Sequence, residues 1–249
     1  MPLRHCASTA PSKVYTLPYA AYCVATPGEA RDTTLYHKAT TMQFIDIHTH
    51  RRPHPGETAI QNSIPPHDTG GFISVGIHPW NITEGYEVSL EEAREAARAD
   101  NVVMIGECGI DKLKSPAPLP VQIALFRAQA DLAEELHKPL IIHCVKAFDS
   151  IVALHKEIHP SQPWIIHGFR GKQQLAQQLI RAGLYISLGE HFNKESALLI
   201  PAERLFIESD ESIKSIEEIY RAVAEVRGCQ VEELVETTTA NARECGIMF

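Results

Sequence analysis

Short apolar runs recur along the chain from residue 44 onward, and this recurrence limits the fold more than any other feature of the sequence. The runs are rich in Ile and Val, and most of them are too short for helices, which is typical of strands buried in a parallel sheet. They lie at residues 44–47, 72–77, 102–105, 139–142, 164–166, 184–188 and 205–207, with a weaker candidate at 58–64. The pattern predicts seven or eight strands.

Amphipathic helices are expected between the later strands. In two segments the apolar residues fall at i, i+3, i+7, i+10 and i+13, which places them on one helix face. The first segment has Ile123, Phe126, Ala130, Ala133 and Leu136, and the second has Ile213, Ile216, Tyr220, Val223 and Val226. A third helix is predicted over "LEEAREAARAD", with Ser89 as its N-cap and Glu92 completing a capping box.

Strands that alternate with helices indicate parallel βα units, and eight such units make an α/β fold of the TIM (β/α)8 barrel type. An open, doubly wound sheet is the alternative. About twenty residues separate His50 from the run at 72–77, and they include four prolines and three glycines. We therefore expect a barrel in which helices are missing between the first strands.

Residues 1–41 differ from the rest of the chain, because Pro, Ala, Ser and Thr are scattered through them without a helical or strand period. No unbroken apolar segment follows Arg4, as a signal peptide would require. Met42 directly precedes "QFIDIHTH". We expect residues 1–41 to be a disordered or loosely packed N-terminal extension, and residues 42–249 to form the barrel.

Composition limits the partners and the compartment. The formal net charge is −8, from 23 Lys and Arg against 31 Asp and Glu, whereas proteins that hold nucleic acid mainly by neutralising phosphates are usually basic. The six cysteines include no C-x-x-C pair, which argues against a disulfide framework and favours the cytoplasm. Because no run of eighteen apolar residues exists, we expect no membrane contact, and nothing indicates an obligate protein partner.

Metal-ligand residue types follow five of the apolar runs. In a TIM barrel the functional side chains lie at the C-terminal ends of the strands, so these residues would meet at one end of the barrel. Imidazole and carboxylate groups suit divalent ions such as Zn, Mg or Mn, and about six of them can hold two ions. Two ions activate water and contact the reacting phosphoryl or acyl oxygens. The residues are His48 and His50, Glu107, His143, His167, and Glu208 with Asp210.

Other catalytic signatures are absent from the sequence. It has no G-x-S-x-G elbow, no G-x-x-x-x-G-K-[ST] loop and no G-x-G-x-x-G after a strand. A cofactor-dependent dehydrogenase or a kinase therefore has little support.

An ordered set of motifs resembles the TatD family of metal-dependent hydrolases. The set consists of H-x-H at 48–50, "GIHPW" at 76–80, "IGECGID" at 105–111, "PLIIHC" at 139–144, "IIHGFRG" at 165–171, "YISLG" at 185–189, "ESD" at 208–210 and "TTTANA" at 237–242. The resemblance runs from Met42 to the C-terminus. It implies a TIM barrel, two divalent metal ions and hydrolysis, with deoxyribonuclease activity in several members.

The resemblance also implies roles for the residues at the strand ends. His48 and His50 would hold one metal ion, and His143 and His167 would hold the second. Glu107 would bridge the two ions and take part in catalysis. Taken alone, His143 and His167 could instead be buried histidines bonded to the backbone.

Asp210 is the second catalytic residue that the resemblance implies. It would bind the water held by the metal ions and act as its base. The alternative is that Asp210 caps the helix that follows it.

Substrate contacts are where the chain departs from the family pattern. The family usually has an arginine two residues after the histidine of "PLIIHC", and this chain has Val145 there, with Lys146 next. Lysine is a point charge and does not replace the bidentate grip of a guanidinium on phosphate. Arg51, Lys146, Arg170 and His78 are the predicted substrate-binding residues, and Glu190 with His191 are further candidates for the mouth of the barrel.

Three hypotheses remain open from the sequence. The first is a two-metal hydrolase that cleaves phosphodiester bonds of a short nucleic acid or small molecule. The second is an amidohydrolase or deacylase that acts on a small cyclic or acylated substrate. The third is a non-enzyme, a barrel that binds metal for stability or presents a surface to a partner, which the open two-metal ligand set disfavours.

Overall fold

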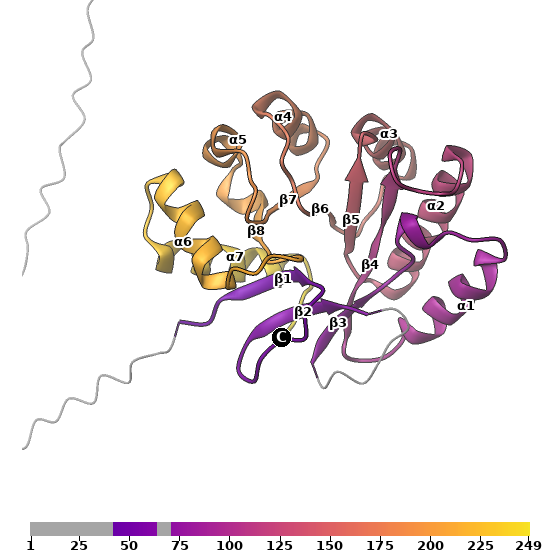
Figure 1. Cartoon of the computed structure of the whole chain (residues 1–249), viewed down its shortest axis with the longest axis horizontal. Coiled ribbons are helices and arrows are strands. Elements are labelled where there is room, and N and C mark those ends of the chain that lie inside the picture. The colour runs from indigo at the N-terminus through magenta and orange to yellow at the C-terminus, as the bar shows by residue number, and fades with distance from the viewer. Residues whose placement is uncertain (1–41, 64–70) are drawn as a thin grey trace, which may run out of the picture. The chain divides into compact units, whose positions relative to one another are not determined.

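The computed structural model describes residues 42–63 and 71–249 of the 249-residue chain (Figure 1). The N-terminal extension predicted for residues 1–41 lies outside the described residues. None of the described helices is long and apolar enough to cross a membrane.

Eight parallel strands form one sheet, and their order in the sheet is their order in the chain. This order confirms the predicted TIM barrel and shows that the doubly wound alternative is wrong. The strands are β1 (Ile45–Thr49), β2 (Thr58–Asn62), β3 (Phe72–Val75), β4 (Val102–Asp111), β5 (Leu140–Val145), β6 (Trp164–Ile166), β7 (Tyr185–Leu188) and β8 (Leu205–Ile207).

The last and first strands meet through a single backbone bridge between Thr49 and Asp210. The Asp210 N–H donates to the His48 carbonyl at 3.0 Å, and the His50 N–H donates to the Asp210 carbonyl at 3.2 Å. Backbone pairing at the seam therefore involves residues that the sequence analysis assigned to the metal site.

Helices follow β3 and every later strand and lie around the outside of the barrel (Figure 1). Within the described residues no helix lies between β1 and β2, as the sequence predicted. The α-helices are α1 (Tyr86–Ala96), α2 (Leu119–Leu136), α3 (Phe148–Ile158), α4 (Gln173–Arg181), α5 (Lys194–Leu199), α6 (Ile216–Arg227) and α7 (Val231–Glu244). Two short 3-10 helices are η1 (Pro79–Asn81) and η2 (Ala202–Arg204).

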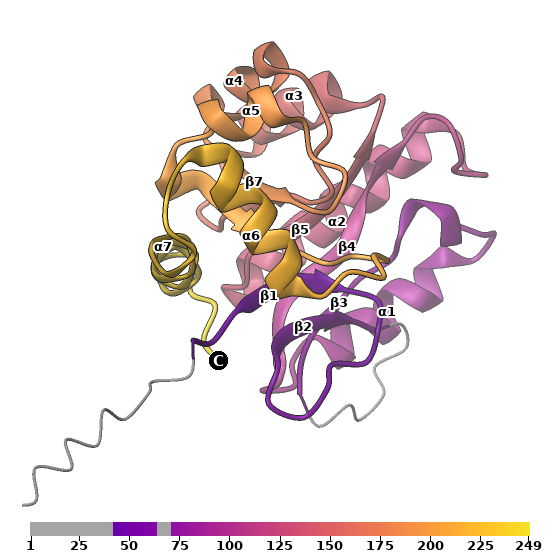
Figure 2. The ribbon, with the colours of Figure 1, turned by 60° about the vertical axis from the view of Figure 1, so that its left-hand side comes forward.

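Two apolar layers hold the barrel together. The inner cluster takes one or more side chains from six of the strands, and the end of the chain packs against it. The outer cluster lies between the strands and the helices, where for example the rings of Phe126 and Trp164 stand 5.0 Å apart. The inner cluster consists of Ile45, Ile47, Ile60, Met104, Ile141, Ile165 and Phe206, with Ala242, Cys245 and Ile247 from the C-terminal segment. Figure 2 shows this segment leaving α7 beside β1.

Two predicted helix starts are wrong. The helix α1 begins one turn early, with Gly85 as its N-cap, so Ser89 lies inside it. The early start adds Tyr86 to the helix, and Tyr86 packs on the cluster of Ile77 and Leu125.

The helix predicted from Ile213 begins only at Ile216, after the N-cap Ser215, which forms a capping box with Glu218. Ile213 is fully exposed in the preceding loop. The capping box satisfies the first backbone N–H groups of α6, so the helix starts at Ile216 although the apolar spacing extends back to Ile213.

Candidate metal centre

The carboxylate of Glu107 is the centre of the site. Glu107 lies inside β4 and not after it, because β4 continues to Asp111 by pairing with β5. The side chain is 2% exposed. The preceding Gly106 has φ +126°, and a Cβ atom there would stand 2.4 Å from the Ile141 carbonyl oxygen. Only glycine allows β4 to pass β5 this closely beside Glu107.

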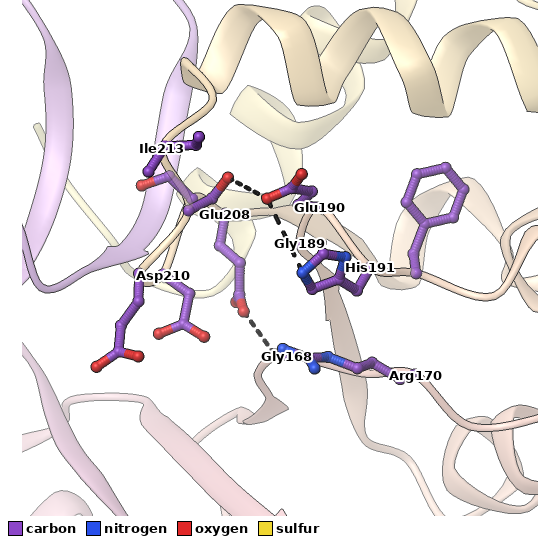
Figure 3. A pocket seen from close by; sticks show the side chains of 12 residues that line it. Gly168, Arg170, Gly189, Glu190, His191, Glu208, Asp210 and Ile213 are labelled. Carbon is purple, nitrogen blue, oxygen red and sulfur yellow. Dashed lines mark hydrogen bonds and ion pairs between the residues drawn. The ribbon is translucent and has the colours of Figure 1, made fainter.

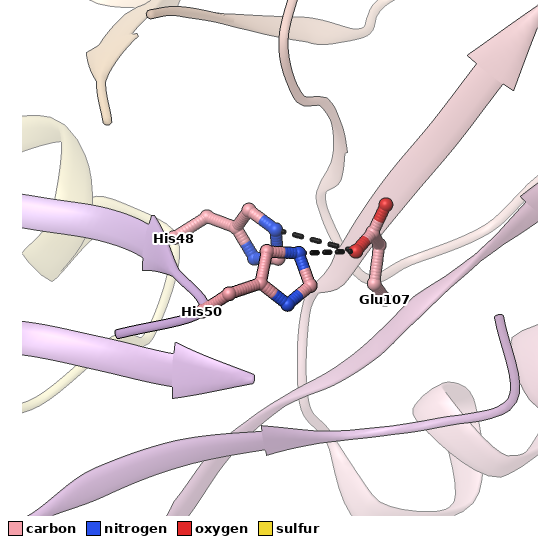
Figure 4. A group of neighbouring side chains, drawn as sticks. All are labelled: His48, His50 and Glu107. Carbon is pink, nitrogen blue, oxygen red and sulfur yellow. Dashed lines mark ion pairs between the residues drawn. The ribbon is translucent and has the colours of Figure 1, made fainter. Parts of the chain in front are cut away.

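His48 and His50 reach the same oxygen of Glu107 from β1 (Figure 4). Their Nε2 atoms lie 3.4 Å and 3.1 Å from Oε2 of Glu107. The two rings are 5.0 Å apart and nearly perpendicular. The H-x-H spacing therefore places both imidazoles on one side of the strand end, as the period of a strand requires.

His143 and His167 face the other oxygen of Glu107. Nδ1 of His143 lies 2.9 Å and Nε2 of His167 lies 2.7 Å from Oε1. Within the described part of the chain, neither ring has the backbone hydrogen bond that the alternative from the sequence required; both bond carboxylates instead. The two histidine pairs thus approach opposite oxygens of a single carboxylate.

Two further carboxylates orient His143 and His167. Nε2 of His143 donates to Asp111 Oδ2 at 3.2 Å, and Nδ1 of His167 donates to Glu208 Oε1 at 3.3 Å. A histidine whose second nitrogen donates to a carboxylate has its tautomer and ring direction fixed. In consequence His143 presents Nδ1 and His167 presents Nε2 to Glu107.

Asp210 completes the cluster on the side of β1. Its Oδ1 lies 3.5 Å from His50 Nε2 and 3.9 Å from His48 Nε2. It does not cap the following helix, since Ser215 is the N-cap of α6. Burial, and next the charge of Glu208, raise the pKa of the Asp210 carboxyl.

We call His48, His50, Glu107, His143, His167 and Asp210 the ligand cluster. Both ring nitrogens of His48 are buried without a hydrogen-bond partner among the described residues. Burial alone would raise the pKa of Glu107, but the surrounding imidazoles outweigh it and hold that pKa well below its usual range. The ligand atoms of His48, His50 and Glu107 lie within 4.8 Å of one another, as do those of His48, His167 and Asp210, and a third such group joins His78 to Glu107 and His143. A buried anion among nitrogen donors fits a divalent cation.

His78, one of the predicted substrate-binding residues, contacts Glu107 directly. Its Nε2 is 3.2 Å from Glu107 Oε1, and its Nδ1 accepts the backbone N–H of Trp80 at 3.1 Å. Burial lowers the pKa of His78, which favours the neutral ring. Because Nδ1 accepts, the proton of the neutral ring is on Nε2 and points at Glu107. His78 is therefore a hydrogen-bond donor to the carboxylate in this arrangement, outside the ligand cluster.

Two cavities open at the cluster. One, of about 350 Å³, is lined by most of the ligand cluster together with Asn62, Trp80 and Glu211. The other, of about 310 Å³, shares Asp210 and Glu211 with the first. Figure 3 shows Glu208 in this second cavity, directed toward the backbone of Gly168.

The predicted substrate-binding residues are placed differently from one another. Arg170 lines the second cavity, as do Glu190 and His191. Arg51 instead forms a two-bond ion pair with Glu57, at 2.6 Å and 3.1 Å, and lines neither cavity. Lys146 is exposed with φ 54° and also lines neither cavity.

Sequence reasoning missed several residues around the cluster. Asp111 lies within the "IGECGID" motif but had no assigned contact, and Glu208 was named beside Asp210 as a metal-ligand residue type but not as a partner of His167. Asn62 lies in the weaker strand candidate at 58–64 and had no assigned role; its side-chain oxygen accepts the Glu107 N–H at 3.1 Å. Trp80 was quoted in "GIHPW" without a role, although a tryptophan at a strand end was a signal for a contact at the barrel mouth.

The chain is similar to known metal-dependent hydrolases. A family model described as "TatD related DNase" matches residues 36–245. The chain is 28% identical over 193 residues to an uncharacterized metal-dependent hydrolase, YabD, of Bacillus subtilis, covering 69% of this chain and 76% of the relative. It is 29% identical over 199 residues to a 3'-5' ssDNA/RNA exonuclease, TatD, of Erwinia amylovora, with the same coverage.

A solved structure shares the fold. The crystal structure of YJJV, a TatD homolog from Escherichia coli K12, superposes with a TM-score of 0.72 at 20% identity and covers 82% of this chain and 98% of that chain.

Proposed function

The chain belongs to the TatD-related DNase family of metal-dependent hydrolases, and from this membership and the site geometry we propose that it cleaves phosphodiester bonds with two divalent ions. The ions are Zn, Mg or Mn. One would be held by His48 and His50 and the other by His143 and His167, with Glu107 between them.

A single observation carries the proposal: the two oxygens of Glu107 face different histidine pairs. Oε2 faces the pair from β1, and Oε1 faces the pair from β5 and β6. A carboxylate in this position can bridge two cations, whereas a one-ion site would need only one of the pairs. The buried, hydrogen-bond-free nitrogens of His48 support the same reading.

The residues of the cluster suit hydrolysis of a phosphodiester. When bound, the ions lower the pKa of water and stabilise charge on the phosphoryl oxygens. Asp210 Oδ1, beside His48 and His50, accepts the proton of the attacking water. The water oxygen bonds to phosphorus, the ester P–O bond breaks, and the proton passes from Asp210 to the leaving alcohol. His78 donates to Glu107 and holds that carboxylate in place.

A nucleic-acid strand is the proposed substrate class, supported by the relatives named as ssDNA/RNA exonucleases. The sequence analysis left an amidohydrolase or deacylase open. The relative from Erwinia amylovora is named as a nuclease and not as an amidase or deacylase. The phosphodiester reading is therefore preferred, and the other becomes an outcome of the test.

The test uses the purified full-length chain. Bound metal is measured by mass spectrometry, and hydrolysis of single-stranded DNA, a small phosphodiester and a panel of esters and amides is followed with Mg, Mn or Zn added. Asp210→Asn is compared with Asp131→Asn, a matched change on the exposed face of α2. We expect Asp210→Asn to slow phosphodiester cleavage by about 10²–10⁴-fold, as loss of a general base does.

Two results would overturn the proposal. If the protein binds no divalent metal, the proposed two-ion site is wrong. If Asp210→Asn keeps full activity, Asp210 is not the base that accepts the proton of water. Cleavage of esters or amides without any cleavage of phosphodiesters would favour the deacylase instead.

A cytoplasmic location is also proposed, because the four cysteines among the described residues, Cys108, Cys144, Cys229 and Cys245, are all free. Cell fractionation followed by detection of the chain tests it.

A further inference from the structure

Trp80 is an exposed aromatic side chain at the wall of the metal cavity. It belongs to η1 and is 42% exposed, whereas the only other tryptophan of the chain, Trp164, is 1% exposed. The indole lines the same cavity as His143 and Glu107. Its ring stands 4.8 Å from that of His78 and 5.7 Å from that of His143. A large apolar ring is thus kept partly in water directly beside the ligand cluster.

The indole is held rigidly in this position. Its Nε1–H donates to Asp111 Oδ2 at 2.6 Å, and its backbone N–H donates to His78 Nδ1. The preceding residue, Pro79, accepts a hydrogen bond from Ser115 at 2.7 Å through its carbonyl. A ring fixed through both its side chain and its backbone loses little conformational freedom when a flat ligand packs on it.

Lys114 supplies a positive charge at the same place. Its Nζ lies 4.4 Å from the centroid of the Trp80 ring, which is a cation–π contact. The lysine is exposed, and its backbone N–H is fixed by Asp111 Oδ1 at 3.0 Å. Its long, flexible stem lets the ammonium leave the ring and follow an anion nearby.

We propose that Trp80 is a stacking platform for a nucleobase, and that Lys114 moves from the indole to a phosphate of the same nucleotide. This inference rests on the proposed phosphodiester substrate and names the substrate as an unpaired nucleotide. Stacking on a protein ring requires a base that is free of its own duplex, so the platform selects single strands and frayed ends. The cavity of about 350 Å³ is near the lower end for small-molecule sites, which suits one nucleotide unit.

Because every base has a stacking face, the platform contributes affinity without strong sequence preference. Lys114 would add one phosphate contact beside the Trp80 ring.

Fluorescence provides a binding test that does not depend on turnover. Trp164 is buried, so quenching by a small ligand reports on Trp80. We expect thymidine 5'-monophosphate to quench the emission of the full-length, Mg-loaded protein, and 2-deoxyribose 5-phosphate, which lacks the base, to leave it nearly unchanged. Equal quenching by both compounds, or none by either, contradicts the platform.

Three variants separate stacking from positioning. Trp80→Leu removes the aromatic face, and Trp80→Phe keeps an aromatic face but removes the N–H that bonds Asp111. Each is assayed on an oligothymidylate and on an abasic strand of equal length. We expect Trp80→Leu to reduce the preference for the base-containing strand by on the order of tenfold, within the range for loss of one stacked base. Trp80→Phe should keep most of that preference while slowing both substrates alike, through Asp111 and His143.

Lys114→Met should raise KM on both strands and reduce the salt dependence of binding, because it removes one phosphate contact. Lys112→Met, at a neighbouring exposed lysine, is the matched control.

The outcomes distinguish failure of the Trp80 platform from failure of the phosphodiester function. If both strands are cleaved and Trp80→Leu leaves their ratio unchanged, the platform is wrong and the phosphodiester function stands. If neither strand is cleaved but thymidine 5'-monophosphate still quenches Trp80, the site binds nucleotides and the hydrolytic function fails.

Discussion

Asp111 accepts a hydrogen bond from Nε2 of His143 at 3.2 Å, and this contact decides which nitrogen His143 turns toward Glu107. Asp111 is itself fixed by the Trp80 indole at 2.6 Å and by the backbone N–H groups of Leu113 and Lys114. Burial alone would raise its pKa, but these hydrogen bonds outweigh it and lower the pKa of Asp111 to about 2. The carboxylate therefore stays charged and remains an acceptor for Nε2 of His143 across the ordinary pH range.

Replacing this carboxylate should weaken metal binding. In Asp111→Asn the amide cannot match a charged acceptor for His143, so the ring loses its fixed direction. We expect the affinity for the metal ion to fall by about 10–100-fold, as for other partners of metal-bound histidines. Titration calorimetry with Zn or Mn measures it, with Asp100→Asn, an exposed change, as the control. Unchanged affinity would show that Asp111 does not orient a metal ligand.

Removing metal should destabilise the fold. A ligand that binds only the native state at 100 times its Kd adds about 2.7 kcal/mol, which corresponds to roughly 5–10 °C in Tm for a domain of this size. We therefore expect a chelator to lower the Tm of the full-length protein by about that amount. Thermal unfolding monitored by circular dichroism measures the shift. Glu107→Gln should abolish most of it, since the bridging carboxylate is lost; a full shift in that variant would place the ions elsewhere.

Gly106→Ala should lower the free energy of unfolding because the added Cβ clashes with β5. The new Cβ would stand 2.4 Å from the Ile141 carbonyl oxygen, at a φ of +126°. Gly85→Ala is the matched control, because Gly85 also has a positive φ, +79°, but nothing lies within 4 Å of its Cβ position. Backbone strain of about 1–3 kcal/mol applies to both, and only Gly106→Ala adds the clash with β5. Urea unfolding should show the larger loss for Gly106→Ala, and equal losses would contradict the close approach of β4 and β5.

Arg170 and Arg51 should differ in their effect on substrate binding. Arg170 lines the second cavity, whereas the guanidinium of Arg51 is already paired with Glu57. We expect Arg170→Met to raise KM on single-stranded DNA. It should also reduce the slope of log binding constant against log salt concentration by about one, as loss of one phosphate contact does. Arg51→Met should raise KM less, and Arg181→Met on the outside of α4 is the control. A larger effect of Arg51→Met would mean that its ion pair opens to bind substrate.

The sequence alone predicted the barrel and the side chains that the structure brings together in the ligand cluster. Strand and helix periods are local properties, and the ends of parallel strands in a barrel must meet at one rim. His48, His143 and Asp210 could therefore be brought together from positions far apart in the chain. Glu107 was found for the same reason, although its strand continues past it to Asp111.

Only the tertiary structure decided how those side chains are oriented. Which nitrogen His143 or His167 presents depends on Asp111 and Glu208, and these carboxylates meet the rings through strand pairing and burial that no local pattern encodes. The same holds for Trp80, whose place beside the cluster depends on a contact from η1 to the end of β4. Hydrogen bonds between side chains of different strands require exact distances and directions, and those exist only once the barrel has closed.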